Sequence, residues 1–144
     1  MPSLRSAPLA ILTLLLGTTL LLLRAWQPLD AIIGTTADDM FYYLEIARNL
    51  SEGRGPTFDG ETPTNGWHPL WMGILVLLRK TAAGSAELQV PLALTLLSLA
   101  NAATGIALWR IASCLSGRVA GLAALSIWML HPWPSQIALS GVEA

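Results

Sequence analysis

The chain alternates between long stretches without charged side chains and shorter segments in which the charges are concentrated. Three uncharged stretches are long enough to cross the hydrocarbon core of a bilayer as a helix, which takes about 20 residues. Inside lipid a backbone must satisfy its own hydrogen bonds, so each stretch is predicted to be helical. The predicted transmembrane helices occupy residues 6–24, 88–109 and 119–138.

The connections between these helices follow from the same pattern. Residues 25–87 form a long polar loop, residues 110–118 a short loop, and residues 139–144 the start of a second polar loop. The sequence His131-Pro-Trp-Pro falls within the third helix and is expected to bend or end it, because proline lacks a backbone donor and clashes with the preceding turn.

The first apolar stretch has two interpretations. Arg5 followed by an apolar run over 9–23 is also the pattern of a signal peptide. The run ends in Arg24-Ala-Trp without the small-x-small pattern of a cleavage site, which favours an uncleaved membrane helix.

A fourth apolar stretch, predicted as a helix over 67–80, is shorter than the others. Its apolar part covers about 18 Å at 1.5 Å per residue, well below the roughly 30 Å of the hydrocarbon core. Two tryptophans and a proline at its start favour a juxtamembrane helix in the interface. The alternative is a spanning helix that continues through 81–84 and takes Arg79 and Lys80 into the membrane.

Composition supports a membrane protein. Hydrophobic residues make up 53% of the chain and charged residues 12%, with a mean hydropathy of +0.57, whereas soluble proteins have about 25% charged residues. The net charge of −1 lacks the basic surface that nucleic-acid binding needs. The one cysteine, Cys114, excludes an internal disulfide and is interpreted as a buried, inert thiol. We therefore expect an all-α membrane protein.

Charge also predicts the orientation in the membrane. Residues 25–87 have eight acidic and four basic side chains, a net charge of −4. Basic residues near helix ends favour the cytoplasm, so three spans with Arg5, Arg110 and Arg118 inside place 25–87 outside. If residues 67–83 also span, the two later arginines lie outside instead.

Within the outer loop, residues 38–51 form a predicted amphipathic helix. Apolar side chains recur there on one face at helical spacing, namely Met40, Tyr43, Leu44, Ala47 and Leu50. The helix begins with Asp38 and Asp39, and carboxylates are favoured at that positive end. Adjacent residues on a helix do not face each other, so one carboxylate can point into a cleft while the other binds a different group.

Two further residues are candidates for chemistry. His68 follows a segment rich in glycine, proline and asparagine. Its predicted role is to contact a phosphate or to transfer a proton; the alternative is that it only lies at a helix start beside Pro69. Glu143 follows the third predicted span. With three spans it emerges on the same side as Asp38 and converges with it; the alternative is that it only marks a helix end.

Three motifs in this order give the chain a resemblance to a known family. Residues 37–48 read Ala-Asp-Asp-x-x-Tyr-Tyr-x-x-Ile-Ala-Arg, residues 53–60 read Gly-x-Gly-Pro-Thr-Phe-Asp-Gly, and residues 63–70 read Pro-Thr-Asn-Gly-Trp-His-Pro-Leu. With the first membrane helix, they resemble the N-terminal part of bacterial polytopic glycosyltransferases of the C-type superfold. The lipid A aminoarabinose transferases and the protein O-mannosyltransferases are similar.

The resemblance implies an activity and a site. Such enzymes transfer a hexosyl or pentosyl group from a polyprenyl-phosphate carrier to a lipid, glycan or protein acceptor at the outer face of the membrane. It implies that Asp38 is the catalytic base and that Glu143 supports it, and that both hold a divalent cation such as Mg²⁺ or Mn²⁺ if the enzyme depends on a metal. The substrate-binding residues that it implies are Asp39, Tyr42, Arg48, Asn65 and His68.

The chain also departs from that family. His68 stands where many relatives have lysine, and the relatives have many more membrane helices. We therefore expect residues 1–144 to be one membrane unit of a longer transferase, inactive alone and completed by a missing C-terminal portion or a partner chain. The expected location is a bacterial inner membrane, among its lipids, multi-pass, with the first loop facing the periplasm or exterior.

Two other classes of function compete with this reading. A non-enzymatic membrane assembly or binding module is the alternative, favoured by the short chain. A transporter is disfavoured because the three predicted spans lack ionisable side chains.

Overall fold

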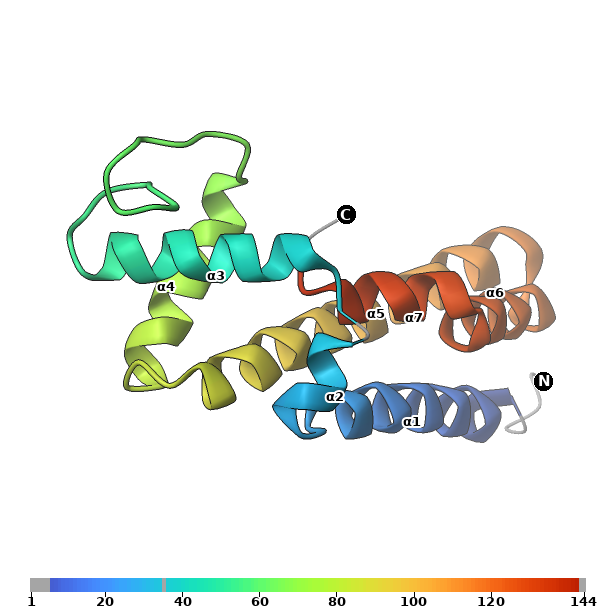
Figure 1. The fold of residues 1–144 in the computed structure, drawn as a ribbon. Helices are drawn as coiled ribbons and strands as arrows, with labels where there is room; N and C mark the ends of the chain where they lie inside the picture. The colour runs from blue at the N-terminus through green and yellow to red at the C-terminus, as the bar shows by residue number, and fades with distance from the viewer. Residues whose placement is uncertain (1–5, 35, 143–144) are drawn as a thin grey trace.

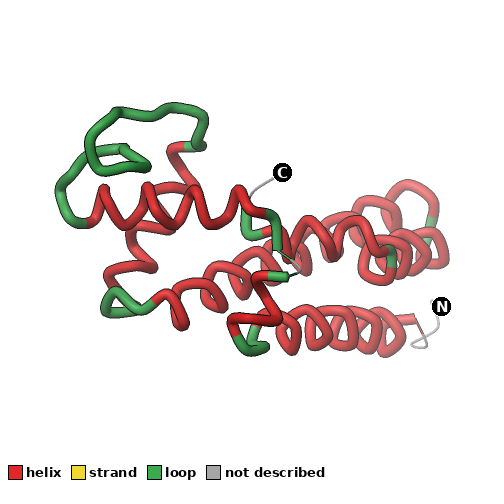
Figure 2. Tube along the Cα trace, viewed as in Figure 1, coloured by secondary structure: helices red, strands yellow, loops and turns green. Residues whose placement is uncertain are grey.

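The computed structural model describes residues 6–34 and 36–142, and helices dominate it (Figures 1 and 2). The helices are α1 (Ser6–Ala25), α2 (Leu29–Ile33), α3 (Asp38–Ser51), α4 (Pro69–Thr81), α5 (Ala86–Ser116), α6 (Arg118–Leu130) and α7 (Pro132–Ser140). These ranges contain no strand, only an isolated antiparallel bridge between Thr57 and Pro63. The predicted all-α class is confirmed.

A bundle of α1, α5, α6 and α7 forms one part of the molecule (Figure 1). Helix α5 runs antiparallel to α1 and to the pair α6–α7. Gly117 alone separates α5 from α6, and its φ of 85° lies in the region that glycine adopts without strain. A Cβ on Gly121 would lie 1.9 Å from Ser113 Oγ. Small residues therefore let α5 and α6 approach closely, as in helix pairs of membrane proteins.

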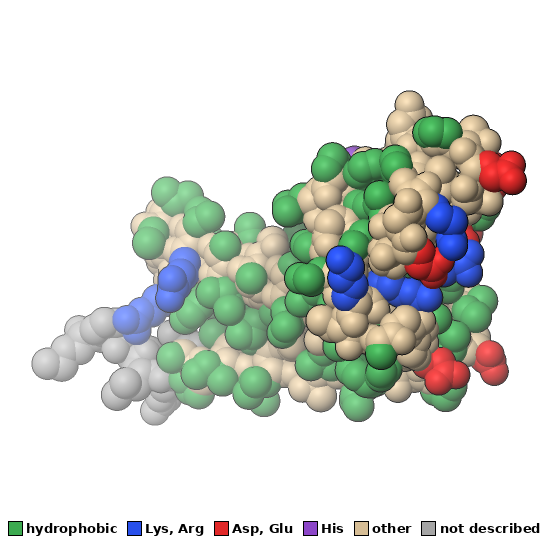
Figure 3. All heavy atoms as spheres, turned by 90° about the vertical axis from the view of Figure 1, so that its left-hand side faces the viewer, with side chains coloured by type: hydrophobic (Ala, Val, Ile, Leu, Met, Phe, Trp, Pro, Cys, Tyr) green, Lys and Arg blue, Asp and Glu red, His purple; other side chains and the backbone are tan. Residues whose placement is uncertain are grey.

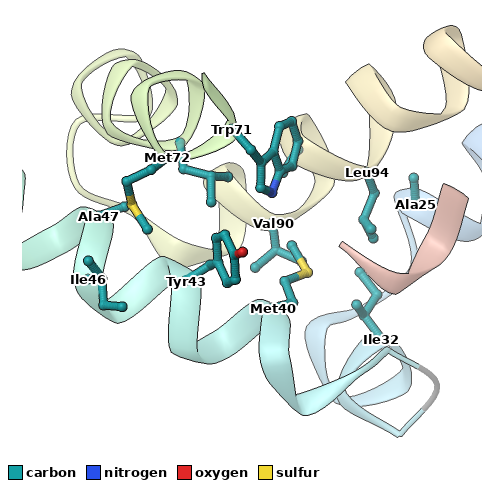
Figure 4. Packing of buried hydrophobic residues seen from close by; sticks show 12 residues of the cluster. Ala25, Ile32, Met40, Tyr43, Ile46, Ala47, Trp71, Met72, Val90 and Leu94 are labelled. Carbon is teal, nitrogen blue, oxygen red and sulfur yellow. The ribbon is translucent and has the colours of Figure 1, made fainter. Parts of the chain in front are cut away.

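Helices α3 and α4 and the loop between them form the second part, at one end of the bundle (Figure 1). Met40, Tyr43, Trp71 and Val90 point toward one another where α3, α4 and α5 meet (Figure 4). The predicted apolar face of α3 is confirmed. Three of its five members are buried, and Leu44 and Leu50 are half-buried against the same core.

Two of the described helices are long and apolar enough to cross a membrane. They are α1, over Ala7–Ala25 with a mean hydropathy of 1.9, and α5, with a mean hydropathy of 1.6. At 13 residues, α6 is apolar but shorter. Helix α4 runs across the direction of α1 and α5 rather than along it (Figure 1).

Several predicted bounds are wrong. Helix α5 continues past residue 109 to Ser116, so most of the predicted loop at 110–118 is helical. Arg110 marks a change of polarity, but the backbone has no breaker before Gly117. The helix predicted at 67–80 is α4, Pro69–Thr81. Cys114 is exposed rather than buried.

The helix predicted at 119–138 is two helices. It is interrupted at His131, which has the extended values φ −72° and ψ 136°, and α7 begins at Pro132. The expected effect of His131-Pro-Trp-Pro is therefore confirmed. Helix α7 ends at Ser140, one residue beyond the predicted start of the second polar loop at 139–144.

Candidate functional site

Two carboxylates lie side by side in sequence at the start of α3. Asp38 and Asp39 occupy its first turn and are both exposed. Asp38 Oδ1 accepts a hydrogen bond from the Asp39 backbone N–H at 3.1 Å. The positive end of the helix dipole stabilises their negative charge. Neither belongs to an ion pair within the part of the chain that the structure describes, so both carboxylates are open to a ligand.

The C-terminal end of α7 packs against this same turn. Gly141 adopts a φ of 81°, and a Cβ there would lie 2.0 Å from Met40 Sδ. Trp71 Nε1 donates a buried hydrogen bond to the Gly141 carbonyl oxygen at 3.2 Å. Helices α3, α4 and α7 therefore meet at one point, although about 100 residues separate Met40 from Gly141 in the sequence.

Glu143, the second predicted catalytic acid and metal ligand, lies outside the described residues. Val142, the last described residue, packs against the core beneath α3. The convergence of Asp38 with Glu143 therefore stays a prediction. In ranges 6–34 and 36–142, no group of three or more histidine, cysteine, aspartate or glutamate side chains has a geometry that would hold a metal ion.

The loop after α3 folds back over that helix through aromatic contacts. The Tyr42 ring stacks on Phe58 with centroids 5.2 Å apart, and its hydroxyl forms a hydrogen bond with Thr64 Oγ1. Trp67 Nε1 donates to the Thr64 carbonyl oxygen at 3.1 Å. Two predicted substrate-binding residues, Tyr42 and Asn65, thus lie where the loop meets α3, and Asn65 itself is exposed.

Asn49 anchors the loop from below, a role that the sequence did not reveal. Its side chain is only 1% exposed. Its Nδ2 donates to the carbonyl oxygens of Thr57 at 2.7 Å and Phe58 at 3.1 Å. Its Oδ1 accepts from Arg54 Nε and an Arg54 terminal nitrogen at 2.9 and 2.7 Å. The sequence does contain a signal for this anchor: Asn49 lies beside the apolar face of a predicted helix, and a turn-rich segment follows that helix directly.

Asp59 organises the tip of the same loop. Its Oδ1 accepts hydrogen bonds from the backbone N–H groups of Thr62 at 2.7 Å and Glu61 at 2.9 Å. These bonds favour the charged form and lower the pKa of Asp59 below its ordinary value of 3.8. The aspartate therefore fixes a turn, and the loop has a defined shape.

Two further predicted substrate-binding residues, His68 and Arg48, have different positions. His68 is the residue before α4, and its backbone N–H donates to Tyr43 Oη at 3.3 Å, so it is tied to α3. Arg48 forms an ion pair with Glu45. It lies ten residues beyond Asp38, which is about 15 Å along the helix axis. His68 is therefore linked to the middle of α3. Arg48 lies near the C-terminal end of that helix.

Charged side chains gather on the end of the molecule formed by α3, α4 and their connecting loop (Figure 3). Large apolar side chains cover much of α1, where Leu12, Leu15, Leu20 and Leu23 are each more than half exposed. Comparisons of the chain with family models, with curated proteins and with solved structures find no match. The site therefore has to be interpreted from its own chemistry.

Proposed function

We propose that this chain is the N-terminal part of a membrane glycosyltransferase that takes a sugar from a polyprenyl-phosphate carrier. The acceptor is a lipid, glycan or protein at the outer face of the membrane. The observation that carries the proposal is the packing of Gly141 against Met40. It brings the end of α7 to the turn that holds the two open carboxylates, beside one end of an apolar helical bundle.

The proposed membrane arrangement has three spans: α1, α5, and α6 with α7 in series. Residues 118–140 are 23 residues, about 34 Å at 1.5 Å per residue, enough for the roughly 30 Å core. Helix α1 exposes most of its leucines, and an apolar surface that extends along a helix favours lipid around it. The crossing direction of α4 favours a juxtamembrane helix.

In the proposed reaction Asp38 acts as the general base. The acceptor hydroxyl gives its proton to the carboxylate as its oxygen attacks the anomeric carbon. The bond from that carbon to the carrier phosphate breaks, and its electron pair leaves on the phosphate oxygen, with inversion at carbon. The negative charge of Asp39 stabilises the positive charge that develops on the sugar.

The leaving phosphate requires a cation or hydrogen-bond donors. His68 is the side chain best placed for this role, because it precedes α4, whose N-terminal end favours an anion. Arg48 is already paired with Glu45, so its charge is less available. Tyr42 and Asn65 line the boundary of loop and helix, where they contact the sugar or acceptor. The orientation proposed for the bacterial inner membrane places this boundary in the periplasm.

Transfer from a radiolabelled polyprenyl-phosphate sugar tests the proposal. The protein is expressed from its gene, and membranes are supplied with carrier-linked mannose or aminoarabinose. Asp38→Asn is expected to lower transfer at least a hundredfold, in the range of a lost general base, while Glu61→Gln on the loop leaves it unchanged. Full activity of Asp38→Asn would reject the assignment. If the parent protein shows no transfer, the alternative of a non-enzymatic membrane assembly or binding module is favoured instead.

A further inference from the structure

A groove runs between α1 and the pair α6–α7. Its volume is about 590 Å³. One end is closed by Gly17, which packs against Met129 closely enough that a Cβ on the glycine would lie 2.7 Å from Met129 Cε. From there the groove extends toward the end of the bundle that holds α2.

The groove is apolar at one end and polar at the other. Because α1 and α6–α7 run in the same direction (Figure 1), residues later in both walls lie nearer the end of the bundle that holds α2. Leu20, Leu21 and Leu130 line the closed end. Arg24 is seven residues beyond Gly17 and Gln136 is seven beyond Met129, and both line the open end together with Gln27. A cation and two amides thus face the mouth of a leucine-lined slot.

The dimensions match half of a bilayer. From Gly17 to Ala25, the end of α1, the chain advances eight residues, about 12 Å along the helix axis, and Gln27 lies just beyond. One leaflet contributes about half of the roughly 30 Å hydrocarbon core. The groove is apolar inside, where an acyl chain would lie, and polar at the mouth, where a lipid headgroup would lie. Its length and polarity therefore match a single lipid molecule.

Charge selects among lipids. Arg24 is exposed at the end of α1, and no ion pair of the described residues includes it. A cation such as Arg24 is favourable at the C-terminal end of a helix. The amide side chains of Gln27 and Gln136 add hydrogen-bond donors beside Arg24 in the groove. We propose that this groove binds one anionic glycerophospholipid, with the headgroup on Arg24, Gln27 and Gln136 and an acyl chain along the leucines. This inference rests on the membrane placement of α1 and is independent of the transferase chemistry.

Native mass spectrometry of the full chain in a neutral detergent tests the inference. Phosphatidylglycerol and phosphatidylcholine with the same acyl chains are titrated separately. One phosphatidylglycerol is expected to bind about fivefold more tightly than phosphatidylcholine, the upper range for an exposed ion pair. Arg24→Gln should reduce that preference to parity, whereas Lys80→Gln, an exposed cation on α4 outside the groove, should retain it.

A second pair of variants tests the slot itself. Leu20→Trp fills the groove and should weaken binding of both lipids, while Leu16→Trp, on the same helix but outside the groove, should not. Both leucines are more than half exposed, so folding tolerates the change. Equal affinity for the two lipids, equal effects of Leu20→Trp and Leu16→Trp, or displacement of the lipid by inorganic phosphate would each overturn the proposal.

Discussion

Asn49 is the residue on which the shape of the outer loop depends most. Asn49→Ala removes two donated and two accepted hydrogen bonds and leaves the Thr57 carbonyl, whose residue is buried, without its partner. We expect a loss of about 2 kcal/mol in unfolding free energy, measured by denaturant unfolding in detergent, with faster proteolysis between residues 52 and 66. Asn65→Ala, an exposed asparagine of the same loop, is the control and should change stability by less than about 0.5 kcal/mol.

Asp59 makes the loop tip sensitive to acid. Its pKa is lowered in the folded protein, so its contribution is present above the ordinary value of 3.8 and is lost as the pH falls through the lower folded value. In an NMR titration the amide protons of Glu61 and Thr62 should therefore report a midpoint below 3.8. Asp59→Ala should abolish that titration. A midpoint at or above 3.8 in the parent protein would contradict the hydrogen bonds described for this turn.

At the residue scale the sequence predicts the position of the acid pair in the candidate site but not the role of Asn49. The acid pair was recognisable because two aspartates start an amphipathic helix that the apolar spacing defines. The role of Asn49 was not, because it depends on carbonyl groups eight and nine residues away whose positions follow from the fold of the loop. Local patterns predict that a helix such as α3 forms, but not the hydrogen bonds of an irregular segment.

Among the elements, helix α3 was predicted with its observed bounds and α1 to within one residue. The wrong end of α5 has a clear cause, because the prediction ends that helix at a charged residue. Arg110 ends an uncharged run, but an arginine is a good helix former, and α5 continues to Gly117. The five-residue α2 was also missed, because so short a helix has no apolar period of its own. Backbone breakers such as Gly117 and the two prolines after His131 set the ends.

The contact between α7 and α3 is testable at a single glycine. In Gly141→Ala a Cβ meets Met40 Sδ at 2.0 Å, in a backbone with φ of 81°. Left-handed strain of about 1–2 kcal/mol and overpacking of about 1–3 kcal/mol together predict a loss of roughly 2–5 kcal/mol in unfolding free energy. The matched control is Gly53→Ala, which has a φ of 80° and no atom within 4 Å of the new Cβ, so that it reports the backbone strain alone.

A double-mutant cycle then separates the contact from the strain. Met40→Ala combined with Gly141→Ala should cost less than the sum of the two single changes, because the shortened side chain makes room for the new Cβ. Strict additivity, or equal losses in Gly141→Ala and Gly53→Ala, would mean that α7 does not end against α3. The observation that carries the proposed function would then be lost.

For the whole molecule the decisive property is the side of the membrane on which each end of the bundle lies. Helix α5 runs antiparallel to α1 and α6–α7, so the loop after α3 lies near one end of the bundle and Cys114 near the other. With three spans these two places are on opposite faces of the membrane. If residues 67–83 also span, both lie outside.

Labelling with a membrane-impermeant maleimide distinguishes these arrangements. In spheroplasts, Glu61→Cys in a Cys114→Ser background should react before lysis, because Glu61 is exposed on the outer loop, whereas the native Cys114, also exposed, should react only after lysis. Reaction of both positions before lysis would support four spans and place the end of α5 outside. Reaction of position 61 only after lysis would reverse the orientation and remove Asp38 from the face on which a polyprenyl-linked donor is proposed to be used.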